Sequence, residues 1–145
     1  MSSNEAYRLA LSKHLGVSEK TISTYWKGRV ALYTALKAMG VGSGDEVILP
    51  AFTCVVVPNA ILYLGATPVY VDIDAQTYNL DPALLEGAIT SKTKAIIPVS
   101  LYGQPADFQA INAIAARHHL PVIEDGAQSF GATHHGHRSG SLSTI

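Results

Sequence analysis

Residues 46–74 read EVILPAFTCVVVPNAILYLGATPVYVDID, and this stretch decides the fold. Apolar runs at 47–49 and 69–71 flank a window of helical length at 54–65. Both runs are continuously apolar, whereas a strand with one face in water would alternate apolar and polar residues. The stretch therefore predicts a strand, a crossover helix and a second, parallel strand, with the sheet covered on both faces.

The same alternation continues toward the C-terminus. Further apolar runs at 95–99 and 122–123 are separated by helical windows at 80–89 and 107–119. Strands that alternate with helices indicate an α/β fold, a three-layer α/β/α arrangement with a mostly parallel sheet. No repeat or low-complexity tract interrupts this pattern.

Two helices are expected before the first strand. Residues 4–15 have amphipathic spacing and end at Gly16, a residue that tolerates a left-handed cap. Residues 29–39 carry apolar side chains at helical spacing, with Gly28 in front and Gly40 behind. A short segment at 20–26 lies between the two helices.

Composition excludes several function classes. Apolar residues make up 48% of the 145 residues and charged residues 14%, which is typical of a globular interior. Ten basic and 11 acidic residues give a net charge of -1, so no overall field attracts nucleic acid or an anionic membrane. Cys54 is the single cysteine, which favours a reducing, cytoplasmic location. No apolar run long enough for export or a membrane span is present.

Ligands of an open parallel sheet bind beyond the carboxyl ends of its strands. Two groups of residues near that edge carry chemistry. Gly28 and Arg29 open a helix whose first amides are free to bind a phosphate, although a glycine before a helix is common. Asp125 ends a strand, where a carboxylate can hold a proton on a heteroaromatic nitrogen or simply cap the next turn.

Taken together, five motifs resemble the DegT/DnrJ/EryC1/StrS aminotransferases, pyridoxal-phosphate (PLP) enzymes that install amino groups on nucleotide-linked keto sugars. The resemblance covers about residues 28–145. The motifs are GRVALYTAL, the stretch from GVGSGDEVILP to VDID, YNLDPALLE, TKAIIPVSLYGQPAD and PVIEDGAQSFGA, and they occur in the family's order.

The resemblance implies a site for the cofactor. Asp125 is similar to the carboxylate that pairs with the pyridine nitrogen, and Gln128 to a glutamine beside the ring. Gly28, Arg29 and Val30 occupy the family's phosphate-binding position. Thr53 lies in the loop that passes over the ring, where the next residue is usually an aromatic that stacks on it. Here that residue is Cys54, and whether Phe52 replaces the aromatic stays open.

Substrate-side expectations are fewer. Tyr102 and Gln104 follow a strand and are plausible substrate contacts or simple turn residues. The resemblance also implies a nucleotide-linked keto sugar and an amino-acid donor, often glutamate, as reactants, and a homodimer for the complete enzyme. It further implies a division into an N-terminal helix and short strand segment, 1–27, and a partial type I PLP-binding large domain, 28–145.

One family residue has no counterpart. The Schiff-base lysine follows the pyridine aspartate by roughly 30 residues in the family, and no lysine follows Lys94 in this sequence. We therefore expect a truncated chain, inactive alone and without a catalytic residue of its own.

Two rival functions remain. Residues 8–29 match a helix-turn-helix pattern, which would bind DNA. A non-catalytic structural or dimerising piece is the other alternative, and it predicts exposed apolar surface and marginal solubility.

Two clusters of possible metal ligands are set aside. The histidines of HHGH, at 134, 135 and 137, have no acid or cysteine at ligand spacing, so a solvated loop is favoured over a metal site. Asp72 and Asp74 are expected to cap a turn.

Overall fold

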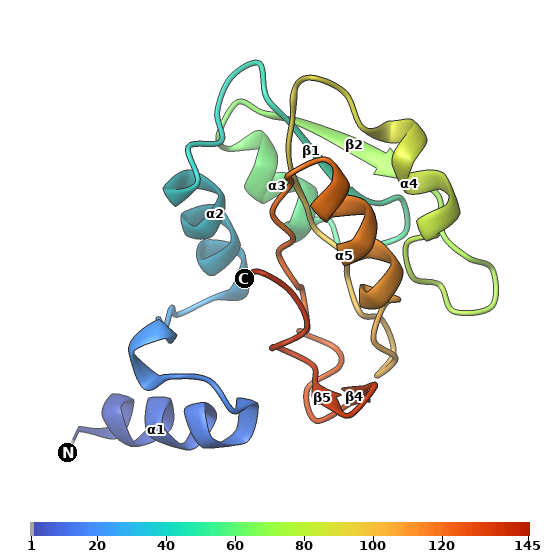
Figure 1. Cartoon of the computed structure of the whole chain (residues 1–145). Coiled ribbons are helices and arrows are strands. Elements are labelled where there is room, and N and C mark those ends of the chain that lie inside the picture. Colours follow the sequence, from blue (N-terminus) through green and yellow to red (C-terminus); the bar gives the residue numbers. More distant parts are fainter. Residues whose placement is uncertain (1) are drawn as a thin grey trace.

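The structure, a computed structural model, describes residues 2–145. Figure 1 shows α1 apart from the body of the molecule and the sheet between helices. In chain order the elements are α1 (Ser3–Leu15), the 3-10 helix η1 (Glu19–Thr21), α2 (Gly28–Ala38), β1 (Glu46–Pro50), α3 (Val56–Leu62), β2 (Thr67–Val71), α4 (Pro82–Ala88), β3 (Thr93–Ile96), α5 (Phe108–Arg117), β4 (Thr133–His134) and β5 (His137–Arg138).

The main sheet is parallel, with the order β2-β1-β3. Residues 121–125 run beside β3 and extend the sheet through parallel bridges, Ile96 to Val122 and Val99 to Asp125. The chain therefore passes from β1 to β2 on one side, and then crosses back over β1 to β3 on the other side. This reversal is a topological switch point, the place where ligands of such sheets bind.

Alternate residues of β1 enter two separate cores. Val47 and Leu49 pack with buried residues of α2 and α3, whereas Ile48 packs with residues of α4 and α5. All three side chains are completely buried. The sheet thus lies between two helical layers, which confirms the predicted three-layer α/β arrangement.

Two predicted strands differ from the structure. The run at 95–99 was expected to be one strand, but β3 ends at Ile96. The Ile97 amide still donates to the Ile48 carbonyl of β1 (2.8 Å), but Pro98 has no amide, and its carbonyl accepts from the Asp125 amide (3.0 Å) on the other side. The run at 122–123 pairs only through the isolated bridges, and it follows Pro121.

The segment at 20–26 also departs from the expected short strand. Glu19–Thr21 form one 3-10 turn, and the residues that follow, up to 27, have no regular structure. The helix-turn-helix alternative for residues 8–29 is therefore contradicted, because residues 18–27 contain this 3-10 turn and no recognition helix. Ser18, whose side chain accepts from the Lys20 amide, starts this turn instead.

The N-terminal helix is held by local caps and by contacts with the C-terminal loops. Ser2 and Glu5 form a capping box at its start, and Gly16 ends it with φ 72°. At its far end the ring of His14 stacks on Phe130 with centroids 4.8 Å apart. Among residues 2–145 no helix has the length and apolar character needed to cross a membrane.

Candidate cofactor site

A cavity of about 790 Å³ opens between the start of α2 and the end of the 121–125 strand segment. Gly28 and Arg29 line it from α2, and Glu124 and Asp125 line it from the strand. Ile145 lies at its wall, and Figure 1 shows the C-terminus beside α2. Two segments almost 100 residues apart in the chain therefore meet at one site.

The start of α2 has unused hydrogen-bond donors. Its N-cap residue, Lys27, makes no side-chain cap, and its first turn contains no acidic residue. Within residues 2–145, the amides of Gly28 and Arg29 have no hydrogen-bond partner, whereas Val30 and Ala31 donate to the Lys27 carbonyl. Free amides and the positive end of an 11-residue helix favour an anion here.

Asp125 faces this helix start from the sheet. Its backbone is fixed on both sides, since its amide donates to Pro98 (3.0 Å) and its carbonyl accepts from the Ser100 amide (3.0 Å). Its Oδ1 accepts from the Ala127 amide at 3.1 Å. Oδ2 has no partner in the part of the chain that the structure describes. The half-buried carboxylate can therefore accept one more hydrogen bond from a ligand in the cavity.

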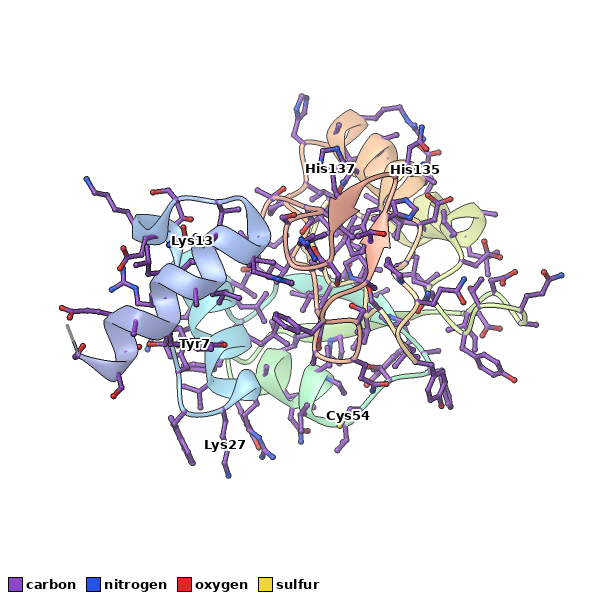
Figure 2. The ribbon with its side chains drawn as sticks, turned by 90° about the horizontal axis from the view of Figure 1, so that it is seen from below. Tyr7, Lys13, Lys27, Cys54, His135 and His137 are labelled. Atoms are coloured by element: carbon purple, nitrogen blue, oxygen red, sulfur yellow. The ribbon has the colours of Figure 1, made fainter. Side chains whose placement is uncertain are left out.

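Thr53 and Cys54 lie in the loop between β1 and α3, outside the cavity lining. Thr53 Oγ1 is buried and has no hydrogen-bond partner among residues 2–145, and the Cys54 side chain is exposed. Figure 2 shows Cys54 and Lys27 on the same side of the molecule. The Phe52 ring lies 5.9 Å from that of Tyr78, and Phe52 is also absent from the lining.

Gln128, Tyr102 and Gln104 also lie outside the lining, and all three are exposed. Gln128 Oε1 accepts from the Tyr102 amide at 3.3 Å, so two of the predicted site residues are joined. Buried Asn79 holds the same loop, because its Oδ1 accepts from the Leu101 amide (3.0 Å) and its Nδ2 donates to the Gln104 carbonyl (3.1 Å).

Several residues of the site have no signal in the sequence. Glu124 is bonded to residues 139–142 rather than solvated, and its donors are too far along the chain to be paired with it by spacing. Ser23, Tyr25 and Lys27 line the cavity from the irregular segment before α2. The polar residues just before Gly28 are the feature of the sequence that could have indicated this part of the site, but such residues are common beside any helix start.

The acids and histidines set aside as metal ligands form local structures. Asp74 Oδ1 accepts from the Gln76 and Thr77 amides, and the bond from the Thr77 backbone holds the Asp74 pKa below its ordinary value. His134 and His137 pair in the β4–β5 hairpin, which replaces the expected loop. Figure 2 places His135 and His137 on the side of the molecule opposite Lys27 and Cys54. Residues 2–145 contain no group of three His, Cys, Asp or Glu that could hold a metal.

Comparison with known proteins decides the family. The model of the DegT/DnrJ/EryC1/StrS aminotransferase family matches residues 2–145. The chain belongs to this family. It is also 64% identical over 118 residues, 81% of its length, to the UDP-2-acetamido-2-deoxy-3-oxo-D-glucuronate aminotransferase of Pseudomonas aeruginosa.

Solved structures of aminotransferases have the same fold. The aminotransferase TlmJ of Streptoalloteichus hindustanus superposes with a TM-score of 0.94 over 99% of this chain at 29% identity. A proposed sugar aminotransferase of Streptococcus pneumoniae in its PLP form gives 0.89 over 99% at 33% identity. The fold is therefore that of the PLP-dependent aminotransferases.

The chain spans about a third of the length of these relatives, 33% of the Pseudomonas enzyme and 39% of TlmJ. The family is PLP-dependent. The cavity fits this cofactor on two counts: free amides at a helix start suit its phosphate, and an unpartnered carboxylate oxygen at Asp125 suits its ring nitrogen.

Proposed function

We propose that this protein takes part in PLP-dependent transamination of a nucleotide-linked keto sugar, in amino-sugar biosynthesis for a surface polysaccharide or glycoside. Residues 28–145 would belong to the PLP-binding large domain and residues 1–27 to an N-terminal segment. The observation that carries this proposal is that Gly28, Arg29 and Asp125 line one cavity. Glutamate as amino donor, a homodimer for the complete enzyme and a cytoplasmic location are parts of the same proposal.

Each residue has a defined task in this proposal. The amides of Gly28 and Arg29 bind the phosphate, and the Arg29 guanidinium adds charge. Asp125 holds the proton on the ring nitrogen. PLP, when bound, supplies the electron sink for carbanionic charge. The family resemblance alone supports a ring contact for Gln128, Thr53 and Cys54 and a sugar contact for Tyr102 and Gln104, since none of these residues lines the cavity.

The covalent attachment of the cofactor has no candidate among the residues after Asp125. The six lysines of the chain all lie at or before position 94. The proposal therefore assigns to residues 1–145 the binding of the cofactor's phosphate and ring, and no step that needs the family's lysine.

Pyridoxamine phosphate (PMP) is the suitable probe, because it has no aldehyde to react with surface lysines. We expect the chain to bind PMP in calorimetry and to give induced circular dichroism in the PMP absorption band. Asp125→Ala should weaken binding by about tenfold to a hundredfold, the effect of losing a charge-assisted hydrogen bond. Pyridoxamine, which lacks the phosphate, should bind more weakly than PMP.

Asp72→Asn is the matched control. Asp72 also follows a strand, but its Oδ1 accepts only from the adjacent Ile73 amide and it does not line the cavity. PMP affinity should be unchanged in this variant. Equal loss in both variants, or no binding of PMP by the parent chain, would contradict the proposal.

A non-catalytic structural or dimerising role is the second candidate. It is favoured by aromatic side chains left in solvent, with Trp26 77%, Tyr102 70% and Phe130 69% exposed. Analytical ultracentrifugation together with the PMP titration separates the two functions. Self-association without PMP binding would support the structural role.

A further inference from the structure

Glu124 binds a distant loop through both oxygens of its carboxylate. Oε1 accepts from the Ser139 hydroxyl (2.7 Å) and from the Gly140 amide (2.7 Å), and Oε2 accepts from the Leu142 amide (2.9 Å). A carboxylate with three donors from one loop makes charge-assisted bonds that fix the loop in one register.

The surroundings of this carboxylate are closely packed. Ser139 and Ser129 are both buried, and their hydroxyl oxygens lie 2.5 Å apart. A Cβ added at Gly126 would lie 3.0 Å from Ser139 Oγ and 3.5 Å from Glu124 Oε1. Because Gly126 has no Cβ, the Glu124 carboxylate and the Ser139 hydroxyl have enough space to form their hydrogen bond.

The bound loop continues along the strand that carries Asp125. The Ile145 amide donates to the Val122 carbonyl (3.1 Å), and the Glu124 amide donates to the Ile145 carbonyl (2.8 Å). Ile145 lines the cavity together with Glu124 and Asp125. The position of this wall thus depends on the register that the Glu124 carboxylate sets at residues 139–142.

We propose that Glu124 is a positioning residue for the cofactor site, because it holds residues 139–145 against the 121–125 strand and so builds the cavity wall beside Asp125. The proposal rests on the proposed function, since the cavity is taken to bind PLP. Glu124 itself acts through the loop, whereas Asp125, its neighbour in the chain, acts on the ligand. Two adjacent acids at one strand end therefore have different tasks.

Two substitutions give different patterns of amide exchange. Glu124→Gln keeps a carbonyl oxygen for Ser139 and Gly140 but turns an NH₂ group toward the Leu142 amide. We expect hydrogen exchange to rise by about tenfold or more at Leu142 and Ile145 and less at Gly140. Glu124→Ala should speed exchange at all three amides. The amides of β1 should exchange as in the parent chain in both variants.

PMP affinity reports the consequence for the site. We expect Glu124→Gln to weaken PMP binding by about tenfold, as expected for a ligand site whose wall has lost its support. Glu86→Gln is the matched control, because Glu86 also accepts two bonds, from Arg117 and His118, but joins α4 to α5 away from the cavity. Its PMP affinity and its exchange at 139–145 should equal those of the parent.

The outcomes separate this inference from the proposed function. Parent-like exchange at Leu142 and Ile145 in Glu124→Gln overturns the loop-holding role. Faster exchange with parent-like PMP affinity overturns the positioning role, and Glu124 is then structural only. A parent chain that binds no PMP overturns the proposed function and with it the link to the cofactor.

Discussion

Asn79 joins two loops at the carboxyl edge of the sheet, and its removal should cost much of the chain's stability. Its side chain is 3% exposed. It lies beside Tyr78, which has φ 60°, and it bonds the loop that contains Tyr102, with φ 53°. Two residues in the left-handed region depend on neighbouring contacts to stay there, because that conformation is costly outside glycine.

The expected magnitude follows from the two bonds. In Asn79→Ala the Leu101 amide, on a residue 3% exposed, is left without an acceptor, and the exposed Gln104 regains water at its carbonyl. An unsatisfied buried donor costs about 1–3 kcal/mol and a resolvated carbonyl about 0.5–1 kcal/mol. We therefore expect the free energy of unfolding to fall by about 2–3 kcal/mol.

Urea unfolding followed by far-ultraviolet circular dichroism measures this loss. Asn79→Asp should also destabilise the chain, because it keeps the acceptor for the Leu101 amide but places a buried carboxylate oxygen against the Gln104 carbonyl. The control is Asn59→Ala in α3, whose side chain bonds no residue of 2–145, and its unfolding free energy should change by less than about 0.5 kcal/mol. An Asn79→Ala variant within about 0.5 kcal/mol of the parent would refute this account of the two loops.

Two further predictions concern the core and the acidic turn. Phe108 is 1% exposed and packs in the core beneath α4 and α5, so Phe108→Ala should lower the free energy of unfolding by about 3–5 kcal/mol. Phe52 is 46% exposed, and Phe52→Ala should lower it by about 1 kcal/mol or less in the same urea assay. The Asp74 pKa is lowered in the folded chain by the Thr77 amide from its ordinary 3.8, so its contribution to stability is present above that value and is lost as the pH falls through the folded pKa. The unfolding midpoints of the parent and Asp74→Asn should therefore differ at pH 6 and converge as the pH falls below 3.8 and through the folded pKa. A difference that stays constant over this range would refute the prediction.

The sequence alone was sufficient for the layers of this protein. Continuous apolar runs such as 47–49 and 69–71, which alternate with windows of helical length, are typical of parallel strands buried on both faces by helices. Glycines at 16 and 28 placed one end of α1 and the start of α2 correctly. Local sequence acts directly on backbone geometry at such positions, so it can be interpreted without the fold.

The candidate site was only partly predictable. The ordered motifs identified Gly28, Arg29 and Asp125, and the fold brings these three into one cavity. Val30, the third predicted phosphate residue, does not line the cavity, and its amide donates to the Lys27 carbonyl. Five further predicted residues lie outside the lining, because loop direction after each strand depends on contacts such as Asn79 with Leu101; they are Thr53, Cys54, Gln128, Tyr102 and Gln104. The early end of β3, before Pro98, and the lack of a strand before α2 depend on which segments pair with each other. The local sequence pattern does not specify these partners.

Glu124 and Asp125 show most clearly what each level decides. The sequence determined that two acids follow a buried strand, and it determined that the second acid matches a family position. Only the tertiary structure decided that the Glu124 carboxylate is bound by residues 139–142, while among residues 2–145 one oxygen of the Asp125 carboxylate keeps no partner in the same cavity lining. Successive side chains of an extended segment point to opposite sides, and what lies on each side is set by chain segments far away in the sequence.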